Sequence, residues 1–213
     1  MGWSIDRGQE TGDRESRSNA QIAGHRSLIP GPLDEWESRW AAYDEPTYQV
    51  VLSYIRPEDV VLDIGAGDLR LARRMASIAR HIYAIEMQPA LLAHQGSLPA
   101  NLTVLCADAR SIPWARGITV GVLLMRHCTH VGLYAARLRA AGCERLITNA
   151  RWGMGVEQMD LGPRRPWPSV EIGWYACLCG QTGFVTGPPE LLTEERMDQV
   201  NETENCPACL PYR

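Results

Sequence analysis

The sequence lacks the features that would place a chain in a membrane or send it out of the cell. No stretch approaches the roughly 20 consecutive apolar residues that span a bilayer, and residues 1–27 lack the apolar run of a secretory signal. We therefore expect a cytoplasmic protein with no membrane partner. An excess of positive charge is also missing, because the formal net charge is -4 and the sequence pI is about 5.8. A polyanionic partner would need a local basic patch.

Internal repeats are absent too, and the composition predicts one main core with a small appendage. Of the 213 residues, 45% are hydrophobic and 22% are charged. Residues 1–30 are rich in Gly, Ser, Asp, Glu and Arg, and they offer too little apolar surface to offset the entropy of ordering them. We predict a flexible segment there, a main domain over 31–160 and a small module over 161–213. Residues 162–168, rich in Pro and Gly, form the expected boundary.

Short apolar runs alternate with stretches of helical period between Asp59 and Trp152, which is typical of βαβ units in a parallel sheet. The expected strands are 60–64, 82–85, 102–105, 120–124 and 146–148. After the first strand, Leu71, Met75, Ile78 and Ala79 share one face of an expected amphipathic helix. Further helices are expected over 89–94 and 133–141. The predicted fold is an α/β, Rossmann-like sheet with helices on both faces.

The two ends of this domain carry weaker patterns. Trp36, Trp40 and Tyr43 recur at helical spacing, and this stripe is either core packing or a lid over a ligand. Near the C-terminus, residues 170–179 and 184–186 flank a Gly-bracketed turn and predict a hairpin. Pro188 and Pro189 then predict the start of a helix.

The most informative stretch is the first expected strand, which ends in Asp63-Ile64-Gly65-Ala66-Gly67-Asp68 and passes into a helix. Glycines allow positive φ angles and let a ligand approach the backbone. Glu86 ends the second strand 21 residues beyond Gly65, close to the offset at which a carboxylate binds a ribose.

These motifs resemble those of the class I S-adenosylmethionine-dependent methyltransferases over about residues 45–152. The resemblance implies that Asp63, Gly65, Ala66 and Gly67 hold the methionine part of the cofactor and that Glu86 binds its ribose. It implies adenine contacts for Asp108 and Ala109, and it adds Met87 and Met125 to the cofactor site. Within the class, residues 83–86 and 89–92 look most like the ribosomal RNA adenine dimethyltransferases.

Two other interpretations of the glycine turn stay open. A dinucleotide-binding dehydrogenase would have a third glycine where this chain has Arg70. A turn that binds no ligand is the plainer alternative.

The residues that would face a methyl acceptor are less typical. Amino-directed enzymes of this class usually carry Asn or Asp, Pro-Pro and an aromatic after the fourth strand, whereas this chain has Met-Arg-His-Cys-Thr-His over 125–130. His127 is a candidate general base, although His127 and His130 could equally shape the pocket or cap the next helix. Asn149, Arg151 and Trp152 follow the fifth strand and are candidate substrate contacts, although Arg151 and Trp152 could equally form a structural stacked pair.

Seven cysteines are distributed unevenly. Cys177, Cys179, Cys206 and Cys209 form two close pairs that predict a structural Zn²⁺ site, with a redox pair or an iron–sulfur cluster as alternatives. Cys106, Cys128 and Cys143 stand singly in expected core elements and are predicted to pack there.

The leading functional hypothesis is a methyltransferase whose acceptor is RNA or another nucleic-acid-containing substrate. Local basic candidates are Arg70, Arg73, Arg74, Arg164 and Arg165. A protein or small metabolite is the alternative acceptor. A non-catalytic adaptor, binding a protein partner through the zinc module or the N-terminal segment, is a hypothesis of another class.

Overall fold

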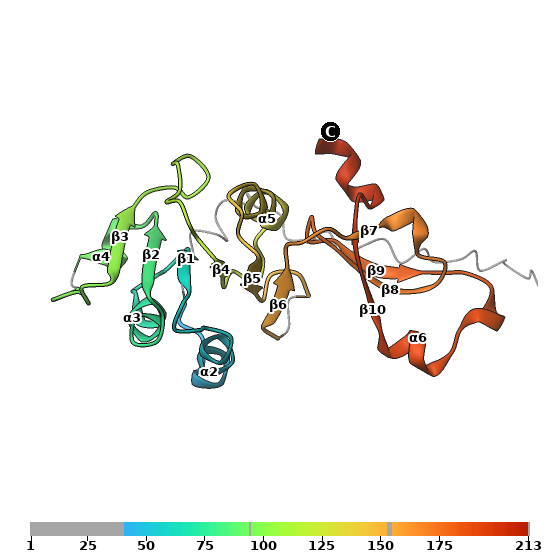
Figure 1. Cartoon of the computed structure of the whole chain (residues 1–213), viewed down its shortest axis with the longest axis horizontal. Coiled ribbons are helices and arrows are strands. Elements are labelled where there is room, and N and C mark those ends of the chain that lie inside the picture. Colours follow the sequence, from blue (N-terminus) through green and yellow to red (C-terminus); the bar gives the residue numbers. More distant parts are fainter. Residues whose placement is uncertain (1–40, 94, 153–154, 213) are drawn as a thin grey trace, which may run out of the picture. The chain divides into compact units, whose positions relative to one another are not determined.

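Two β-sheets organise the described residues, which are 41–93, 95–152 and 155–212 of the computed structural model (Figure 1). These residues all belong to one compact unit. Some predictions fall outside the described residues: the flexible segment 1–30, Trp36 and Trp40 of the aromatic stripe, and the end of the expected helix at His94.

The larger sheet has the strand order β3-β2-β1-β4-β5-β6. Its strands are β1 (Val60–Ile64), β2 (His81–Glu86), β3 (Leu102–Cys106), β4 (Val120–Leu123), β5 (Arg145–Thr148) and β6 (Glu157–Asp160). The first five are parallel, as predicted, and β6 runs antiparallel to β5. The strand order reverses between β1 and β4, and in open α/β sheets ligands bind at such a switch point.

Helices cover both faces of this sheet, which confirms the predicted fold class. They are α2 (Glu45–Ser53), α3 (Arg70–Ala76), α4 (Pro89–Leu92) and α5 (Val131–Ala140). Successive strand residues point to opposite faces, so Val61 joins the core cluster of α2 and α3 while Leu62 joins that of α5. The expected amphipathic helix ends at Ala76, yet Ile78 and Ala79 still pack against the same core.

The smaller sheet has the order β7-β10-β8-β9. Its strands are β7 (Arg165–Pro166), β8 (Gly173–Cys177), β9 (Thr182–Val185) and β10 (Val200–Glu204). The predicted hairpin is β8 paired with β9 in antiparallel register. We refer to the described residues from Arg165 onward as the C-terminal module.

One element of the C-terminal module corrects a prediction. Pro188 and Pro189 start only a 3-10 turn, Pro189–Leu191, and the chain is extended again at Leu192. The α-helix is α6 (Glu194–Asp198), which begins after Thr193 because the Thr193 side chain accepts a hydrogen bond from the Arg196 amide. A side-chain cap, rather than the prolines, therefore sets the start of this helix.

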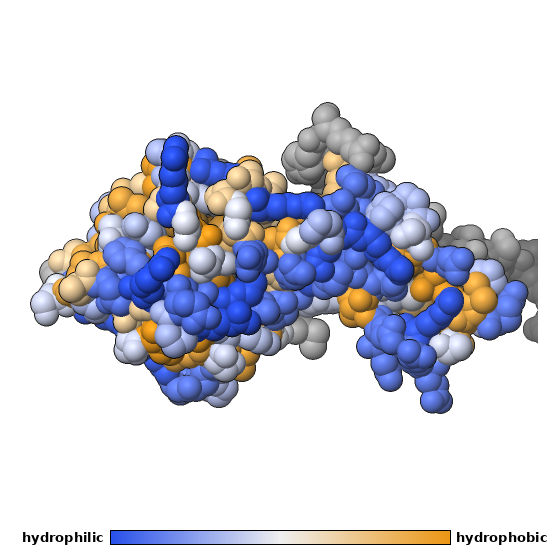
Figure 2. Space-filling model, viewed as in Figure 1, coloured by the Kyte–Doolittle hydropathy of each residue, from blue (hydrophilic) through white to orange (hydrophobic). Residues whose placement is uncertain are grey.

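On the face in view in Figure 2, hydrophobic residues lie in separate patches among hydrophilic ones. Within the described ranges, no helix is long and apolar enough to cross a bilayer.

Candidate functional site

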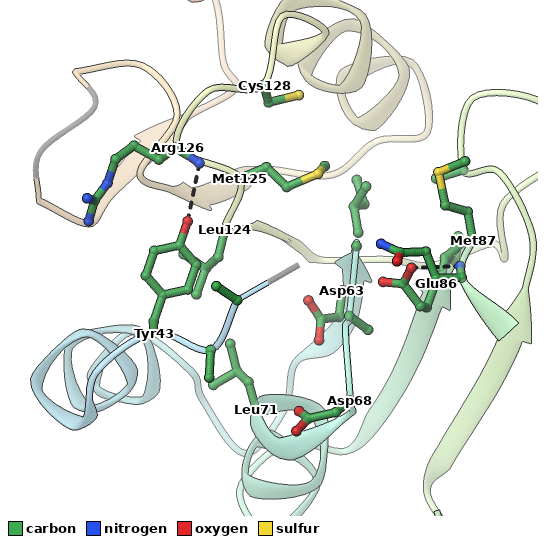
Figure 3. A pocket seen from close by; sticks show the side chains of 18 of the residues that line it. Tyr43, Asp63, Asp68, Leu71, Glu86, Met87, Leu124, Met125, Arg126 and Cys128 are labelled. Carbon is green, nitrogen blue, oxygen red and sulfur yellow. Dashed lines mark hydrogen bonds between the residues drawn. The ribbon is translucent and has the colours of Figure 1, made fainter. Parts of the chain in front are cut away.

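A cavity of about 600 Å³ lies at the carboxyl ends of β1, β2, β3 and β4, at the point where the strand order reverses (Figure 3). Nine residues that the sequence predicted for cofactor or catalysis line it: Asp63, Gly65, Ala66, Glu86, Met87, Asp108, Ala109, Met125 and His127. The fold thus gathers one site from segments that are as much as 64 residues apart in the sequence.

The glycine turn after β1 forms one wall of the cavity. Gly65 and Gly67 have φ angles of 73° and 58°, a backbone region that favours glycine. The amides of Gly65 and Ala66 both donate to the Ile85 carbonyl, at 2.9 and 3.0 Å. A Cβ on Gly65 would stand 3.2 Å from Sδ of Met125, so a side chain there would crowd the opposite wall.

Asp63 carries a buried carboxyl of which one oxygen is unpartnered among the described residues. Its side chain is 3% exposed, and Oδ2 has no hydrogen-bond partner within the described part of the chain. Burial, reinforced by the negative charge of Glu86, raises the pKa of Asp63 to about 7. A cationic or hydrogen-bond-donating ligand in the cavity would satisfy this carboxyl.

Glu86 is held in place by the backbone. Its Oε2 accepts a 2.8 Å hydrogen bond from the Gly67 amide, and Oε1 accepts one of 2.8 Å from the Gln88 amide. Each carboxylate oxygen can accept a further hydrogen bond, so the pair of oxygens suits a diol. Gly67 does not itself line the cavity, and its amide contributes by orienting Glu86.

Asp108 lines the cavity with its carboxylate already engaged. Arg110 donates to it from Nε and Nη2, both at 3.0 Å, and these bonds hold the pKa of Asp108 below its usual value. Ala109 accepts hydrogen bonds on its carbonyl from Trp114 and Arg137. An adenine contact on this wall could use the backbone or share the Asp108 carboxylate with Arg110.

The opposite wall belongs to the β4–α5 segment, our name for residues 124–130. Leu124, Met125, Arg126, His127 and Cys128 all line the cavity. The hydroxyl of Tyr43 accepts a 3.3 Å hydrogen bond from the Arg126 amide (Figure 3).

Tyr43, just before α2, and Tyr48, within α2, also line the cavity. The sequence offered Tyr43 only as part of a stripe that could be a lid, and it assigned Tyr48 to no site. Tyr43 also packs partly against the core, so core packing is confirmed for this residue and its role as a lid stays a prediction. The stripe was the only sequence signal that could have found it.

The three predicted substrate residues lie away from this cavity. Asn149 is buried, and neither polar atom of its side chain has a partner in the described ranges. Arg151 binds Glu157 and Glu202, and its side chain is 1% exposed. Burial opposes the charge of Arg151, but its hydrogen bonds to Glu157 and Glu202 outweigh burial and raise its pKa. Trp152 is half-buried.

The four paired cysteines form one cluster. Their Sγ atoms all lie within 4.8 Å of one another, and two pairs, Cys177 with Cys209 and Cys179 with Cys206, are each 3.6 Å apart. Cys206 and Cys209 are 3.8 Å apart. These separations are too long for disulfides and match the edge of about 3.8 Å that a tetrahedron with Zn–S bonds of about 2.3 Å requires. The cluster could hold a tetrahedral metal ion.

The three single cysteines differ in burial. Cys128 and Cys143 are buried in the core cluster of α5, as predicted. The prediction for Cys106 was wrong, because Cys106 is exposed at the end of β3, an edge strand.

Comparison with known proteins gives structural similarity only. No protein-family model matches the sequence, and no curated protein matches it. Similar solved structures include the precorrin-8w decarboxylase of Methanobacterium thermoautotrophicum, with 20% identity and a TM-score of 0.41 over 52% of this chain. They also include a dimethyladenosine transferase from Plasmodium falciparum, with 15% identity and a TM-score of 0.44 over 51% of this chain. The tRNA (m1A58) methyltransferase of Aquifex aeolicus has 15% identity and a TM-score of 0.43 over 55% of this chain. The matches span 65%, 42% and 53% of those chains. At this level of similarity, function has to be inferred from the chain's own residues.

Proposed function

We propose that the chain is an S-adenosylmethionine-dependent methyltransferase whose cofactor binds in the cavity between β1, β2 and β4. The observation that carries this proposal is the pair of buried carboxylates, Asp63 and Glu86, at neighbouring strand ends beside a glycine turn. Asp63 would hold the methionine part, Glu86 the ribose hydroxyls, and Ala109 the adenine. The unpartnered Oδ2 of Asp63 fits a cofactor that carries positive charge.

Bound S-adenosylmethionine supplies a methyl group on a positively charged sulfur, so the main task left to the protein is alignment. Met125 faces Gly65 across the cavity and narrows the space in which a donor could sit. His127 lines the cavity on this side and would accept a proton from an oxygen or nitrogen acceptor, as histidines often do in general base catalysis. The β4–α5 segment is therefore the acceptor side of the site.

RNA or another nucleic-acid-containing molecule is the acceptor that we propose. Arg126 lies over the ring of Tyr43, 5.8 Å from its centre, at the acceptor side, and such a pair suits a stacked base. The predicted basic candidates add little free charge. Arg70 pairs with Asp68, Arg74 with Glu45 and Arg164 with Glu202, while Arg73 and Arg165 donate to neutral groups. We therefore expect few phosphate contacts and a shallow salt dependence of binding.

Zn²⁺ is the metal that we propose for the four-cysteine cluster. The sulfur separations support it, and four protein ligands would leave no open position for a substrate. Its role is then structural. The small sheet that surrounds it has few buried side chains of its own.

Calorimetry on the full chain tests the cofactor assignment first. We expect binding of S-adenosylmethionine and of S-adenosylhomocysteine, and no binding of NADH. Absence of heat with both adenosyl compounds would overturn the proposal, and binding of NADH alone would favour the dehydrogenase.

Incubation with methyl-labelled cofactor and fractionated cell extract then identifies the acceptor. Label in RNA supports the proposed acceptor class. Label in protein or in small molecules would show that the acceptor is a protein or a small metabolite instead. Cofactor binding without label in any fraction would favour the non-catalytic adaptor.

A further inference from the structure

The four-cysteine cluster lies directly against the first turn of α5. A Cβ placed on Gly132 would stand 3.0 Å from both Cα and the carbonyl oxygen of Cys179. A Cβ on Gly180 would stand 3.1 Å from Cβ of Val131. The metal-binding turn 177–180 and the helix therefore meet backbone to backbone, and the contact depends on two glycines.

Two further contacts hold the C-terminal module to the same helix. Leu178, between two of the cysteines, packs against the core cluster that contains Cys128, Val131 and Tyr134. Arg139, near the end of α5, binds Glu204 of β10 at 2.8 Å. Cys177, Cys179 and α5 thus form one packed unit.

The helix continues directly from the β4–α5 segment into this contact. Cys128 and Tyr134 both line the cavity, and the Tyr134 amide donates to the carbonyl of His130, which precedes the helix. The Cys128 amide in turn donates to the Met125 carbonyl at 2.8 Å. A displacement of Val131 and Gly132 would therefore move the acceptor side of the cavity. The glycine turn and Glu86 belong to other elements and are held by bonds between β1 and β2.

We propose that the metal centre positions the β4–α5 segment through α5, so that metal binding orders the acceptor side of the cavity and leaves the cofactor side intact. Gly132 and Leu178 are the positioning residues. The assignment of the two sides rests on the proposed function, but the mechanical coupling does not, and it can be measured without any methyl acceptor.

Hydrogen exchange and NMR on the full chain test the coupling, with Zn²⁺ bound and after its removal by a chelator. We expect exchange in residues 125–134 to rise roughly tenfold on removal, while β1 and β2 stay protected. The imidazole signals of His127 and His130 should shift, and that of His81 on β2 should not. Affinity for S-adenosylhomocysteine should stay within about threefold.

Two outcomes would overturn this proposal. If the rise in exchange is confined to residues 165–212, the metal stabilises only the C-terminal module. If β1 and β2 lose protection as well, the metal holds the whole fold. Failure to bind S-adenosylhomocysteine in both states would instead count against the proposed function.

A variant that keeps all four thiols provides an independent test. Gly132→Ala should favour the helix by propensity, yet its Cβ would press on the Cys179 backbone. With Zn²⁺ bound, the imidazole signals of His127 and His130 in this variant should shift as they do in the wild type when Zn²⁺ is removed. Leu133→Ala, at the exposed neighbouring position, is the matched control and should resemble the wild type. A Gly132→Ala protein with wild-type imidazole signals would contradict the coupling.

Discussion

The backbone amide of Gly67 donates a 2.8 Å hydrogen bond to Oε2 of Glu86, so the glycine turn after β1 is tied to the last residue of β2. The Gln88 amide holds the other oxygen of the same carboxylate. Glu86 is therefore fixed before any ligand arrives, and a fixed acceptor binds its ligand with a smaller entropic cost.

Glu86→Gln should weaken the binding of S-adenosylhomocysteine by about ten- to a hundredfold, because hydrogen bonds to a charged acceptor contribute about 1.5–3 kcal/mol. Calorimetry measures the change. Asp68→Asn is the control, since Asp68 also lines the cavity but is paired with Arg70. Wild-type affinity in Glu86→Gln would remove Glu86 from the cofactor site.

The affinity for S-adenosylmethionine should rise with pH up to about 7 and then level off. Asp63 has a pKa of about 7 and is largely neutral below it, whereas a cationic ligand favours its charged form. Each pH unit below 7 should lower the affinity by up to about tenfold. Titrations between pH 5.5 and 8.5 measure this effect, and Asp63→Asn should show a flat profile. A flat profile in the wild type would contradict the assignment.

Asp63→Asn should also stabilise the fold in a pH-dependent way. The pKa of Asp63 is about 7 in the folded chain and 3.8 when unperturbed, so the unfolded chain loses its proton first. Stability is therefore lost as the pH rises from about 4 to about 7, by on the order of 4 kcal/mol. In urea unfolding, the free energy of unfolding of the variant should increase relative to that of the wild type over this pH range. A difference that is independent of pH would mean that Asp63 is not buried as described.

Replacement of one clustered cysteine should remove the metal. The wild type should carry one Zn²⁺ per chain, and Cys179→Ser should lose it and unfold at a temperature lower by about 10 °C or more. Metal analysis and thermal unfolding measure the two effects. Cys106→Ser is the control, because Cys106 is exposed and lies on the other sheet. Equal metal content in both variants would exclude the four-cysteine site.

Arg151→Met should destabilise the fold by about 2–4 kcal/mol, because it leaves Glu157 without its buried partner and Glu202 with Arg164 alone. Arg74→Met, which breaks the exposed pair with Glu45, should cost less than about 1 kcal/mol. Denaturant unfolding compares the two. If Arg151→Met is as stable as the wild type but binds acceptor more weakly, the predicted substrate role is correct.

Local patterns in the sequence were enough to predict the parallel strands, the glycine turn, Glu86 at the next strand end and the cysteine pairs. Each of these features depends on residue types at short spacing, which a single stretch of sequence displays. The antiparallel β6 escaped prediction because only Met159 of its four residues is buried, so it has no apolar run to mark it.

Only the tertiary structure decided which side chains meet. Arg151 follows a strand end as a substrate residue would, but its partner Glu202 stands 51 residues further along the chain, in the other sheet. Tyr43 enters the cavity because α2 packs beside the reversal of strand order, and Cys179 touches Gly132 because the C-terminal module packs on α5. Sequence spacing sets the periodicity and face of one element, whereas the partner of a charge or a glycine depends on how separate elements pack.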